Sequence, residues 1–367
     1  MNDGIGTKIR ISEKKVLIAM SGGVDSSVAA YLLKRQGYEC IGINMKLFEN
    51  EDIGNGGKAC CSLEDAEDAR SVAQSLGIPF YIHNLSDDFK ERVIKKFIYE
   101  YENGSTPNPC IDCNRFIKFE KLLQRSKRLG MDYIATGHYA RIEYDRINKR
   151  RLLKKAADES KDQSYVMYSM TQEQLARTLF PLGELSKSEV RDIAKKQGFI
   201  NAKKRDSQDI CFASDGHYAG FIEGYTGKTY EAGDFIDAGG NILGRHKGLI
   251  RYTIGQRKGL GLSLLKPLYV CSKNPENNTI TLCEDSGLYS KTLEAADFNW
   301  IVQDEAAIPT RVKAKIRYNQ ESQSAEITRI SKNRAGLEFH QPQRAVTKGQ
   351  AVVLYDGDTV LGGGTIQ

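Results

Sequence analysis

Seven residues near the start of the chain, 21–27 with the sequence SGGVDSS, are the best suited to chemistry. They follow an unbroken apolar run and precede an apolar-rich stretch, an order that predicts a buried strand, a glycine turn and the start of a helix. Such a turn points backbone N–H groups and the positive end of a helix dipole at one spot. The serines add donors, and Asp25 could hold Mg²⁺ against phosphates. The loop predicts a phosphate or pyrophosphate site, without the lysine of a Walker loop or the G-x-G-x-x-G spacing.

The cysteines supply the second chemical signal. Cys110 and Cys113 form a C-x-x-C pair in a proline-stiffened loop, which suits a redox couple, half a zinc site or part of an iron–sulfur site. N–H groups of the following helix are expected to lower the thiol pKa. Cys211 lies in a charged context and is either a buried apolar residue or a reactive one. The remaining cysteines are predicted to be buried in strands (Cys40, Cys271, Cys283) or are left unassigned (Cys60, Cys61).

Composition describes an ordinary globular protein. The 367 residues suffice for two or three domains, and 40% are hydrophobic and 27% charged. No apolar run approaches the roughly 20 residues of a membrane span, and residues 1–15 lack a signal core, which favours a cytoplasmic enzyme. The net charge of +6 is partly clustered at 149–155, 203–205, 245–247 and 257–258. Each cluster either neutralises nucleic-acid phosphates or is a solvated surface.

The first half of the chain alternates strand-like and helix-like segments. Strands are predicted at 16–20, 40–45, 80–83 and 132–136, with helices between them, one capped by Ser62 and another ending at Gly37. This alternation predicts a parallel sheet with helices on both faces. Ligands bind at the carboxyl ends of such strands, so the glycine loop and Gly137 are expected to face one pocket.

The second half changes character. Residues 163–198 read as helical, with a helix starting at Ser186 or Ser188, and beyond 216 short alternating runs predict two β-rich units with a boundary near 290–299. The predicted fold is α/β, with a Rossmann-like N-terminal domain (1–215), a small central β-rich domain (216–290) and a C-terminal β-barrel (291–367).

Taken together, the motifs resemble one family across nearly the whole chain. The 21–27 loop is similar to that of the PP-loop ATP pyrophosphatases. Within that superfamily, the sequence resembles the MnmA family of tRNA-specific 2-thiouridylases. The matching segments are NPCIDCN at 108–114, ATGHY at 135–139, KDQSY at 161–165, LSK at 185–187, DICF at 209–212, YTIGQRKG at 252–259 and RY at 317–318.

The resemblance implies a reaction. ATP adenylates the C2 oxygen of the wobble uridine, pyrophosphate leaves, and sulfur from a cysteine persulfide then displaces AMP to give 2-thiouridine. The implied cofactors are ATP and Mg²⁺. The implied partners are tRNAs of the Lys, Glu and Gln types and a cysteine desulfurase or sulfur-relay protein, with no membrane involved.

The resemblance also assigns residues. Cys211 would carry the persulfide, and Cys113 would attack it, releasing hydrogen sulfide and leaving a Cys113–Cys211 disulfide. ATP would be bound by Ala19, Met20, Ser21, Gly22, Gly23, Val24, Asp25, Ser26, Met45 and Gly137. The target base would contact Asn108, Pro109 and Cys110. The rest of the tRNA would contact His138, Lys161, Asp162, Gln163, Arg317, Tyr318 and Gln350.

Alternatives remain open at this point. Some family members have an aspartate where this chain has Cys110, and that aspartate has been given the role of general acid. Cysteine is a weaker acid at neutral pH, so this role does not transfer to Cys110. Cys110, Cys113 and Cys211 could instead ligate a [4Fe–4S] cluster that binds sulfide. The chain could also be another PP-loop enzyme, such as an amidotransferase synthetase or argininosuccinate synthase, or an RNA-binding module with a vestigial nucleotide loop.

Overall fold

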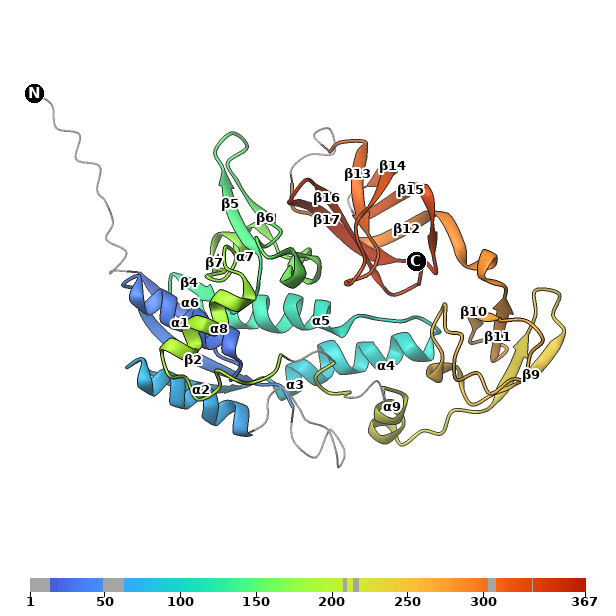
Figure 1. Cartoon of the computed structure of the whole chain (residues 1–367), viewed down its shortest axis with the longest axis horizontal. Coiled ribbons are helices and arrows are strands. Elements are labelled where there is room, and N and C mark those ends of the chain that lie inside the picture. Colours follow the sequence, from blue (N-terminus) through green and yellow to red (C-terminus); the bar gives the residue numbers. More distant parts are fainter. Residues whose placement is uncertain (1–13, 49–62, 207–209, 214–217, 303–307, 332) are drawn as a thin grey trace, which may run out of the picture.

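The computed structural model describes residues 14–48, 63–206, 210–213, 218–302, 308–331 and 333–367. Within these ranges the strands form three separate sheets (Figure 1). The predicted cap at Ser62, the pair Cys60–Cys61 and Asp209 lie outside the described residues. The α/β fold class is confirmed, while the domain limits given above stay a prediction.

The first sheet is parallel and has the order β3-β2-β1-β4-β7. Residues of β1 alternate between two buried clusters: Leu17 and Ala19 belong to one, and Val16 and Ile18 to the other. Both faces of the sheet are therefore covered, as predicted. Its strands are β1 (Lys15–Ala19), β2 (Glu39–Lys46), β3 (Phe80–Asn84), β4 (Tyr133–Ala135) and β7 (Thr178–Leu179).

Helices connect these strands. Several succeed one another without a break, so the predicted helices near 89–101 and 116–129 are each built from consecutive α and π segments. The α-helices are α1 (Val24–Arg35), α2 (Leu63–Ser75), α3 (Ser86–Phe89), α4 (Lys95–Glu102), α5 (Pro109–Asp112), α6 (Leu122–Arg128), α7 (Gln172–Ala176), α8 (Lys187–Lys196) and α9 (Tyr218–Thr226). The π segments are η3 (Lys90–Ile94) and η4 (Cys113–Lys121), and the 3₁₀ turns are η5 (Glu159–Lys161), η6 (Ser164–Met167), η8 (Leu249–Arg251) and η9 (Asp285–Leu288).

The two other sheets are built from later strands. The central sheet has the order β10-β11-β8-β9, and the C-terminal one closes into a six-stranded barrel because β12 pairs with both β15 and β17. The central strands are β8 (Gly233–Ile236), β9 (Ile242–His246), β10 (Tyr269–Asn274) and β11 (Thr279–Cys283). The barrel strands are β12 (Tyr289–Trp300), β13 (Arg311–Lys315), β14 (Gln323–Ser331), β15 (Arg334–Arg344), β16 (Ala351–Asp356) and β17 (Thr359–Ile366).

A hairpin from the N-terminal half joins the barrel sheet. It consists of β5 (Arg141–Asp145) and β6 (Arg150–Lys154), and β6 pairs with β17 where Lys154 lies opposite Thr359. Arg141 reinforces this junction by donating to the carboxylate of Asp358 at 2.8 Å. The barrel is thus attached to the parallel-sheet domain by strand pairing as well as by side chains.

Two sequence-based interpretations were wrong. Residues 163–198 are not uniformly helical, because β7 adds an edge strand to the parallel sheet there. The boundary expected near 290–299 stays a prediction, and this stretch belongs to β12, the first strand of the barrel. Cys271 and Cys283 are half-buried rather than buried, and they form a disulfide between the paired strands β10 and β11.

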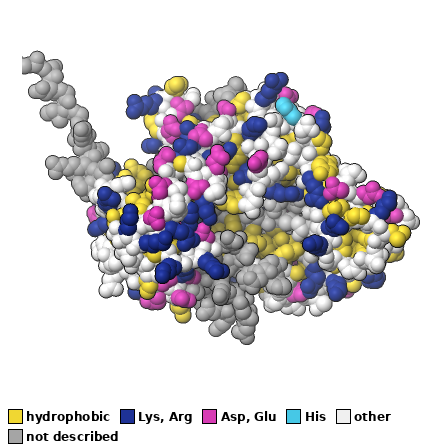
Figure 2. Space-filling view, viewed as in Figure 1, with side chains coloured by type: hydrophobic (Ala, Val, Ile, Leu, Met, Phe, Trp, Pro, Cys, Tyr) yellow, Lys and Arg dark blue, Asp and Glu magenta, His cyan; other side chains and the backbone are white. Residues whose placement is uncertain are grey.

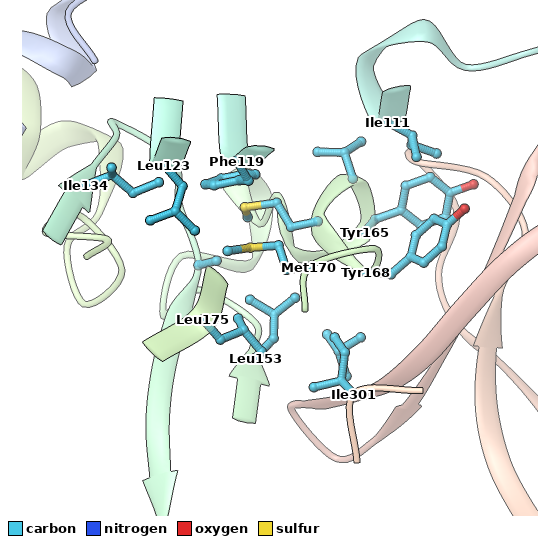
Figure 3. Packing of buried hydrophobic residues seen from close by; sticks show 14 of the residues in the cluster. Ile111, Phe119, Leu123, Ile134, Leu153, Tyr165, Tyr168, Met170, Leu175 and Ile301 are labelled. Carbon is cyan, nitrogen blue, oxygen red and sulfur yellow. The ribbon is translucent and has the colours of Figure 1, made fainter. Parts of the chain in front are cut away.

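One buried cluster spans the junction between the barrel and the parallel sheet. Figure 3 shows Ile111 beside the rings of Tyr165 and Tyr168, with Ile301 on the barrel side of the same cluster. Tyr165 is fully buried, and its hydroxyl donates to the carbonyl of Ala351 on β16 at 2.8 Å. Burial raises the pKa of Tyr165, so the hydroxyl remains a donor.

We expect Tyr165→Phe to destabilise the protein by about 1–2 kcal/mol, because the buried carbonyl of Ala351 loses its side-chain donor. Thermal denaturation measures the effect. Tyr99→Phe is the matched control, since Tyr99 is 62% exposed. Equal melting temperatures for the two variants would contradict a stabilising role for this hydrogen bond.

Candidate active site at the carboxyl edge of the parallel sheet

The glycine loop lies where the strand order of the sheet reverses. The chain builds β2 and β3 on one side of β1 and returns to place β4 on the other side. The loop after β1 and the segment after β4 therefore leave the sheet side by side, at the position where parallel sheets bind ligands. Ala19, Met20 and Met45, all predicted to bind ATP, also lie at the carboxyl ends of β1 and β2.

Two glycines are required by close backbone contacts here. Gly22 has a φ of +82°, and a Cβ at this position would lie 2.1 Å from the carbonyl oxygen of Asp65. A Cβ on Gly137 would lie 2.6 Å from the backbone nitrogen of Ser26. The segment after β4 thus packs directly on the first turn of α1, and larger side chains would separate the two.

The first turn of α1 offers donors to an anion. Its N-cap is Gly23, which has no side chain to cap the N–H groups that follow. The hydroxyl of Ser26 donates to the carbonyl of Gly23 at 3.0 Å and lies 3.4 Å from that of Ser21. Uncapped N–H groups, two hydroxyls and a helix dipole on one spot form a site suited to phosphate oxygens.

Asp25, the acidic residue of the loop, is held by a lysine. Lys187 Nζ lies 2.7 and 2.8 Å from the two carboxylate oxygens of Asp25, and the Tyr139 hydroxyl donates to the same group at 2.8 Å. Lys187 Nζ also lies 2.8 Å from Asp206, which in turn binds Lys161 at 3.0 Å and Arg191 at 2.8 Å. Opposite charges therefore alternate through the site, and Mg²⁺ could reach Asp25 only if Lys187 moved.

The surroundings favour the charged form of this network. Burial raises the pKa of Asp206, but the hydrogen bonds from Lys187 and Lys161 outweigh it, and the net shift is downward. Burial and the neighbouring Asp25 raise the pKa of Tyr139, so its hydroxyl stays protonated and donates. The first effect keeps Asp206 available as an anionic partner of Lys187, and the second keeps Tyr139 as a donor to Asp25.

Cys113 and Cys211 pack into the same apolar cluster, although they are far apart in the sequence. Cys113 is 8% exposed and is a free thiol, and Cys211 is half-buried against the cluster that also contains Phe212. Burial raises the pKa of Cys113 to about 11, and the nearby Lys118 opposes this rise only in part. The expectation that helix N–H groups lower this pKa was therefore wrong, because desolvation outweighs them.

The C-x-x-C loop presents its two cysteines differently. Asn108 is the N-cap of α5, and its side chain accepts the N–H of Cys110 at 3.1 Å. This places Cys110 on the surface and Cys113 in the interior. No group of three or more His, Cys, Asp or Glu residues in the described part of the chain is arranged to hold a metal ion. The predicted iron–sulfur ligand set of Cys110, Cys113 and Cys211 is thus not assembled, and we derive no step through a cluster.

Several residues predicted to contact tRNA have structural partners instead of open surfaces. His138 is 9% exposed and lies between Thr136, 2.7 Å from Nδ1, and Lys118, 3.3 Å from Nε2. Burial and Lys118 lower the pKa of His138 well below its usual value, so the ring is neutral. Asp162 accepts the N–H groups of Ala156 and Ser164, each at 3.1 Å.

Gln163 and Lys161 belong to the nucleotide side of the site. Gln163 accepts the N–H of Tyr139 at 2.9 Å and donates its own N–H to the Tyr139 carbonyl, which fixes the segment after β4. Lys161 binds Asp206, as described above. A tRNA contact by either residue stays a prediction.

The barrel closes over the loop that carries the cysteines. Gln350 donates to the carbonyl of Thr106 at 2.6 Å, and Thr106 donates to that of Lys348 at 2.9 Å. Arg317 donates to the carbonyls of Arg344 and Ala345, and the adjacent Tyr318 is 36% exposed. Three residues predicted to bind tRNA therefore lie on the barrel, and Gln350 directly adjoins the segment before Asn108.

Sequence reasoning missed the roles of Lys187, Asp206 and Arg191. One local signal was available: Lys187 is the first residue of α8, directly after the N-cap Ser186 and within the capping box that Ser186 forms with Glu189. A cation is unfavourable at the positive end of a helix dipole, so a lysine at this position indicates an anionic partner elsewhere. Nothing local in the sequence indicated that this partner would be Asp25 and Asp206.

Comparison with known proteins places this site in a family. A family model described as tRNA methyl transferase HUP domain matches residues 14–215, one described as tRNA methyl transferase PRC-barrel domain matches 219–284, and one described as Aminomethyltransferase beta-barrel domain matches 290–366. The tRNA-specific 2-thiouridylase MnmA of Clostridioides difficile is 52% identical over 96% of this chain and 98% of its own. That of Acetivibrio thermocellus is 52% identical over 97% of this chain and 100% of its own.

The chain belongs to the tRNA-specific 2-thiouridylase family. Among solved structures, a 4-thiouridine synthetase–RNA complex with bound ATP is 18% identical, covers 55% of this chain and 46% of its own, and has a TM-score of 0.34. This likeness is too remote to carry an argument about the 2-thiouridylase site. No described helix of the chain is long and apolar enough to cross a membrane.

We expect alkylation of Cys113 by iodoacetamide to be slow at pH 8, because a pKa of about 11 leaves about one thiol in a thousand ionised. The rate is expected to rise about tenfold per pH unit towards pH 11. Mass spectrometry of the labelled protein separates Cys113 from the exposed Cys110, which serves as the internal control and should react first. Equal labelling of both at pH 7 would contradict the burial of Cys113.

Proposed function

We propose that this chain forms 2-thiouridine at the wobble position of tRNA in an ATP-dependent reaction, with Cys211 as persulfide carrier and Cys113 as its attacking partner. The full-length similarity to tRNA-specific 2-thiouridylases supports the activity. The single observation that carries the residue assignment is the packing of Cys113 and Cys211 in one apolar cluster. The reaction runs in the cytoplasm, where both ATP and tRNA are present.

ATP binds at the loop between β1 and α1. Uncapped N–H groups of the first α1 turn and the hydroxyls of Ser21 and Ser26 receive the phosphates. In this proposal Lys187 turns from Asp25 to the incoming phosphates. Asp25 would then hold Mg²⁺, and the ion would neutralise phosphate charge.

The chemistry begins on the tRNA. The C2 oxygen of the uridine attacks the α-phosphorus of ATP, the bond to the β-phosphate breaks, and pyrophosphate leaves. This step converts a poor leaving group into AMP. Lys187 and Arg191, which balance Asp206 in the described state, are placed to stabilise the negative charge that develops on the phosphates.

Sulfur transfer follows at the cysteines. The Cys113 thiolate attacks the inner sulfur of the Cys211 persulfide, a Cys113–Cys211 disulfide forms, and hydrogen sulfide leaves as HS⁻. HS⁻ adds to C2 and AMP departs with the original oxygen. A cysteine desulfurase or relay protein restores the persulfide after a dithiol has reduced the disulfide. Because the Cys113 pKa is raised by burial, the cluster around it must loosen before this thiol ionises.

The tRNA lies across the face where the barrel meets the C-x-x-C loop. Asn108, Pro109 and Cys110 hold the target base, and Tyr318 and Gln350 approach from the barrel. The tRNAs read at this surface are those of the Lys, Glu and Gln types. A vestigial nucleotide loop would predict tRNA binding without ATP turnover, and the experiments below separate this alternative.

We expect Lys187→Met to lower tRNA-dependent AMP formation about a hundredfold, because the phosphates lose a fixed cation in a partly buried site. AMP and pyrophosphate release are measured with radiolabelled ATP. Binding of tRNA should change little, because Lys187 faces Asp25 and Asp206. Lys195→Met, on the same helix but with a 61% exposed side chain, is the control and should keep full activity. Normal AMP formation by Lys187→Met would remove Lys187 from the mechanism.

We expect Cys113→Ser and Cys211→Ser to abolish 2-thiouridine formation while AMP formation continues, since only sulfur transfer needs the thiols. Mass spectrometry of digested tRNA measures the product. Cys40→Ser is the control, because Cys40 is a buried thiol in a different cluster. Full thiolation by either catalytic variant would overturn the persulfide route. The persulfide route would also be overturned, in favour of an iron–sulfur cluster, if activity followed the bound iron and was lost in Cys110→Ser.

A further inference from the structure

The β5–β6 hairpin projects from the body of the molecule beside the barrel (Figure 1). Its turn comprises residues 146–149, and Arg146, Ile147 and Lys149 at this turn are exposed. Arg150 and Arg151 follow at the start of β6. Figure 2 shows dark blue side chains at the same projection. The family resemblance assigns no role to this hairpin.

Two of the other basic clusters in the sequence have a cation that is paired with an acid. Lys204 of the 203–205 cluster is held by Asp65 and Asp68, and Arg245 of the 245–247 cluster lies 3.4 Å from Asp234. By contrast, within the described ranges no carboxylate is paired with the hairpin cations Arg146, Lys149, Arg150 and Arg151. The hairpin's own acids bind other groups of the hairpin.

Glu143 and Asp145 are both engaged within the hairpin. Glu143 binds Lys154 at 2.7 Å. Asp145 accepts the N–H groups of Ile147 and Asn148 at 2.9 and 3.2 Å, and the Asn148 side chain at 2.7 Å. These bonds to the turn lower the pKa of Asp145, so it remains an anion that orders the turn. The four cations, two in the turn and two at the start of β6, therefore give this end of the hairpin a net positive charge.

Two further features suit a nucleic-acid backbone. The guanidinium of Arg151 lies 4.7 Å from the ring centre of Tyr144 on the paired strand, which gives a flat cationic face. Lys149 has a φ of +52°, a left-handed conformation that is favourable for glycine and unusual for lysine. A lysine here accepts a conformational cost that glycine would avoid.

We propose that the β5–β6 hairpin is an arm that binds the tRNA phosphate backbone outside the target base, through Arg146, Lys149 and the Arg151–Tyr144 pair. This inference rests on the proposed function and adds a second contact region for the same substrate. The hairpin is joined to the barrel through β17 and Arg141, so the arm and the base-binding surface are held together by the same framework.

The test uses the full chain with Lys149→Gly and Arg146→Gln combined, and Lys149→Gly alone. Glycine adopts the left-handed turn readily, so the fold should be preserved, and the melting temperature checks this. The matched control combines Lys34→Gln with Arg128→Gln. These two exposed residues lie near the C-terminal ends of α1 and α6, at the amino edge of the parallel sheet. Their substitution removes the same amount of charge as the double hairpin variant.

We measure the dissociation constant of unmodified tRNA at several salt concentrations. The double hairpin variant should bind about tenfold more weakly near 0.1 M salt, and the slope of log affinity against log salt should fall by about two. The single variant should show a smaller change in the same direction. The KM for tRNA should rise while kcat at saturating tRNA stays unchanged, because the arm does not touch the reacting atoms. The control should match the unmodified protein.

Unchanged affinity and salt slope in the double variant would overturn the arm, as would an equal loss in the control. A lower kcat with unchanged KM would also overturn it, because the hairpin would then act on the chemistry. Failure of the unmodified protein to bind and thiolate tRNA would instead overturn the proposed function, and this inference with it. The two failures are distinguishable, because the proposed function is tested on the unmodified protein and the hairpin arm on its variants.

Discussion

The active site depends on one ammonium group shared between two carboxylates. Lys187 connects Asp25, in the loop after β1, with Asp206, which follows α8, and thereby draws three distant segments of the chain together. Without that cation the two acids would repel each other in a partly buried site. In the proposed reaction an incoming triphosphate would compete with both carboxylates for the lysine. The charge that assembles these segments would then also recognise the nucleotide.

The cysteine half of the site is governed by burial rather than by charge. Lys118 and the helix N–H groups would favour a thiolate at Cys113, yet the apolar cluster around it raises the pKa to about 11. A protonated, enclosed thiol is protected from oxidation and from stray electrophiles. In the proposed mechanism Cys113 would become a nucleophile only after its surroundings change, which would tie sulfur transfer to substrate binding. Cys110, on the surface, has no such protection.

The sequence was informative where the signals were contiguous. The apolar run, glycine turn and helix start predicted β1, its loop and α1, and the serines at 186 and 188 predicted the start of α8, whose N-cap is Ser186. Features that depend on distant residues were not predictable: the partner of Lys187, the desolvation of Cys113, and the pairing of Cys271 with Cys283 across two strands. The β5–β6 hairpin was missed: β5 (RIEYD) alternates polar and apolar residues, but its partner β6 (RRLLK) does not.

The attachment of β6 to β17 and of Thr106 to Gln350 has a consequence for biosynthesis. Residues near 105 and 150 emerge from the ribosome long before their partners at 350–366. The strands β5 and β6 can pair with each other before β17 is made, but their attachment to the barrel must wait for that strand. The contact between Thr106 and Gln350 must wait in the same way. A chain that stops before the barrel would thus lack the surface that we propose for tRNA binding.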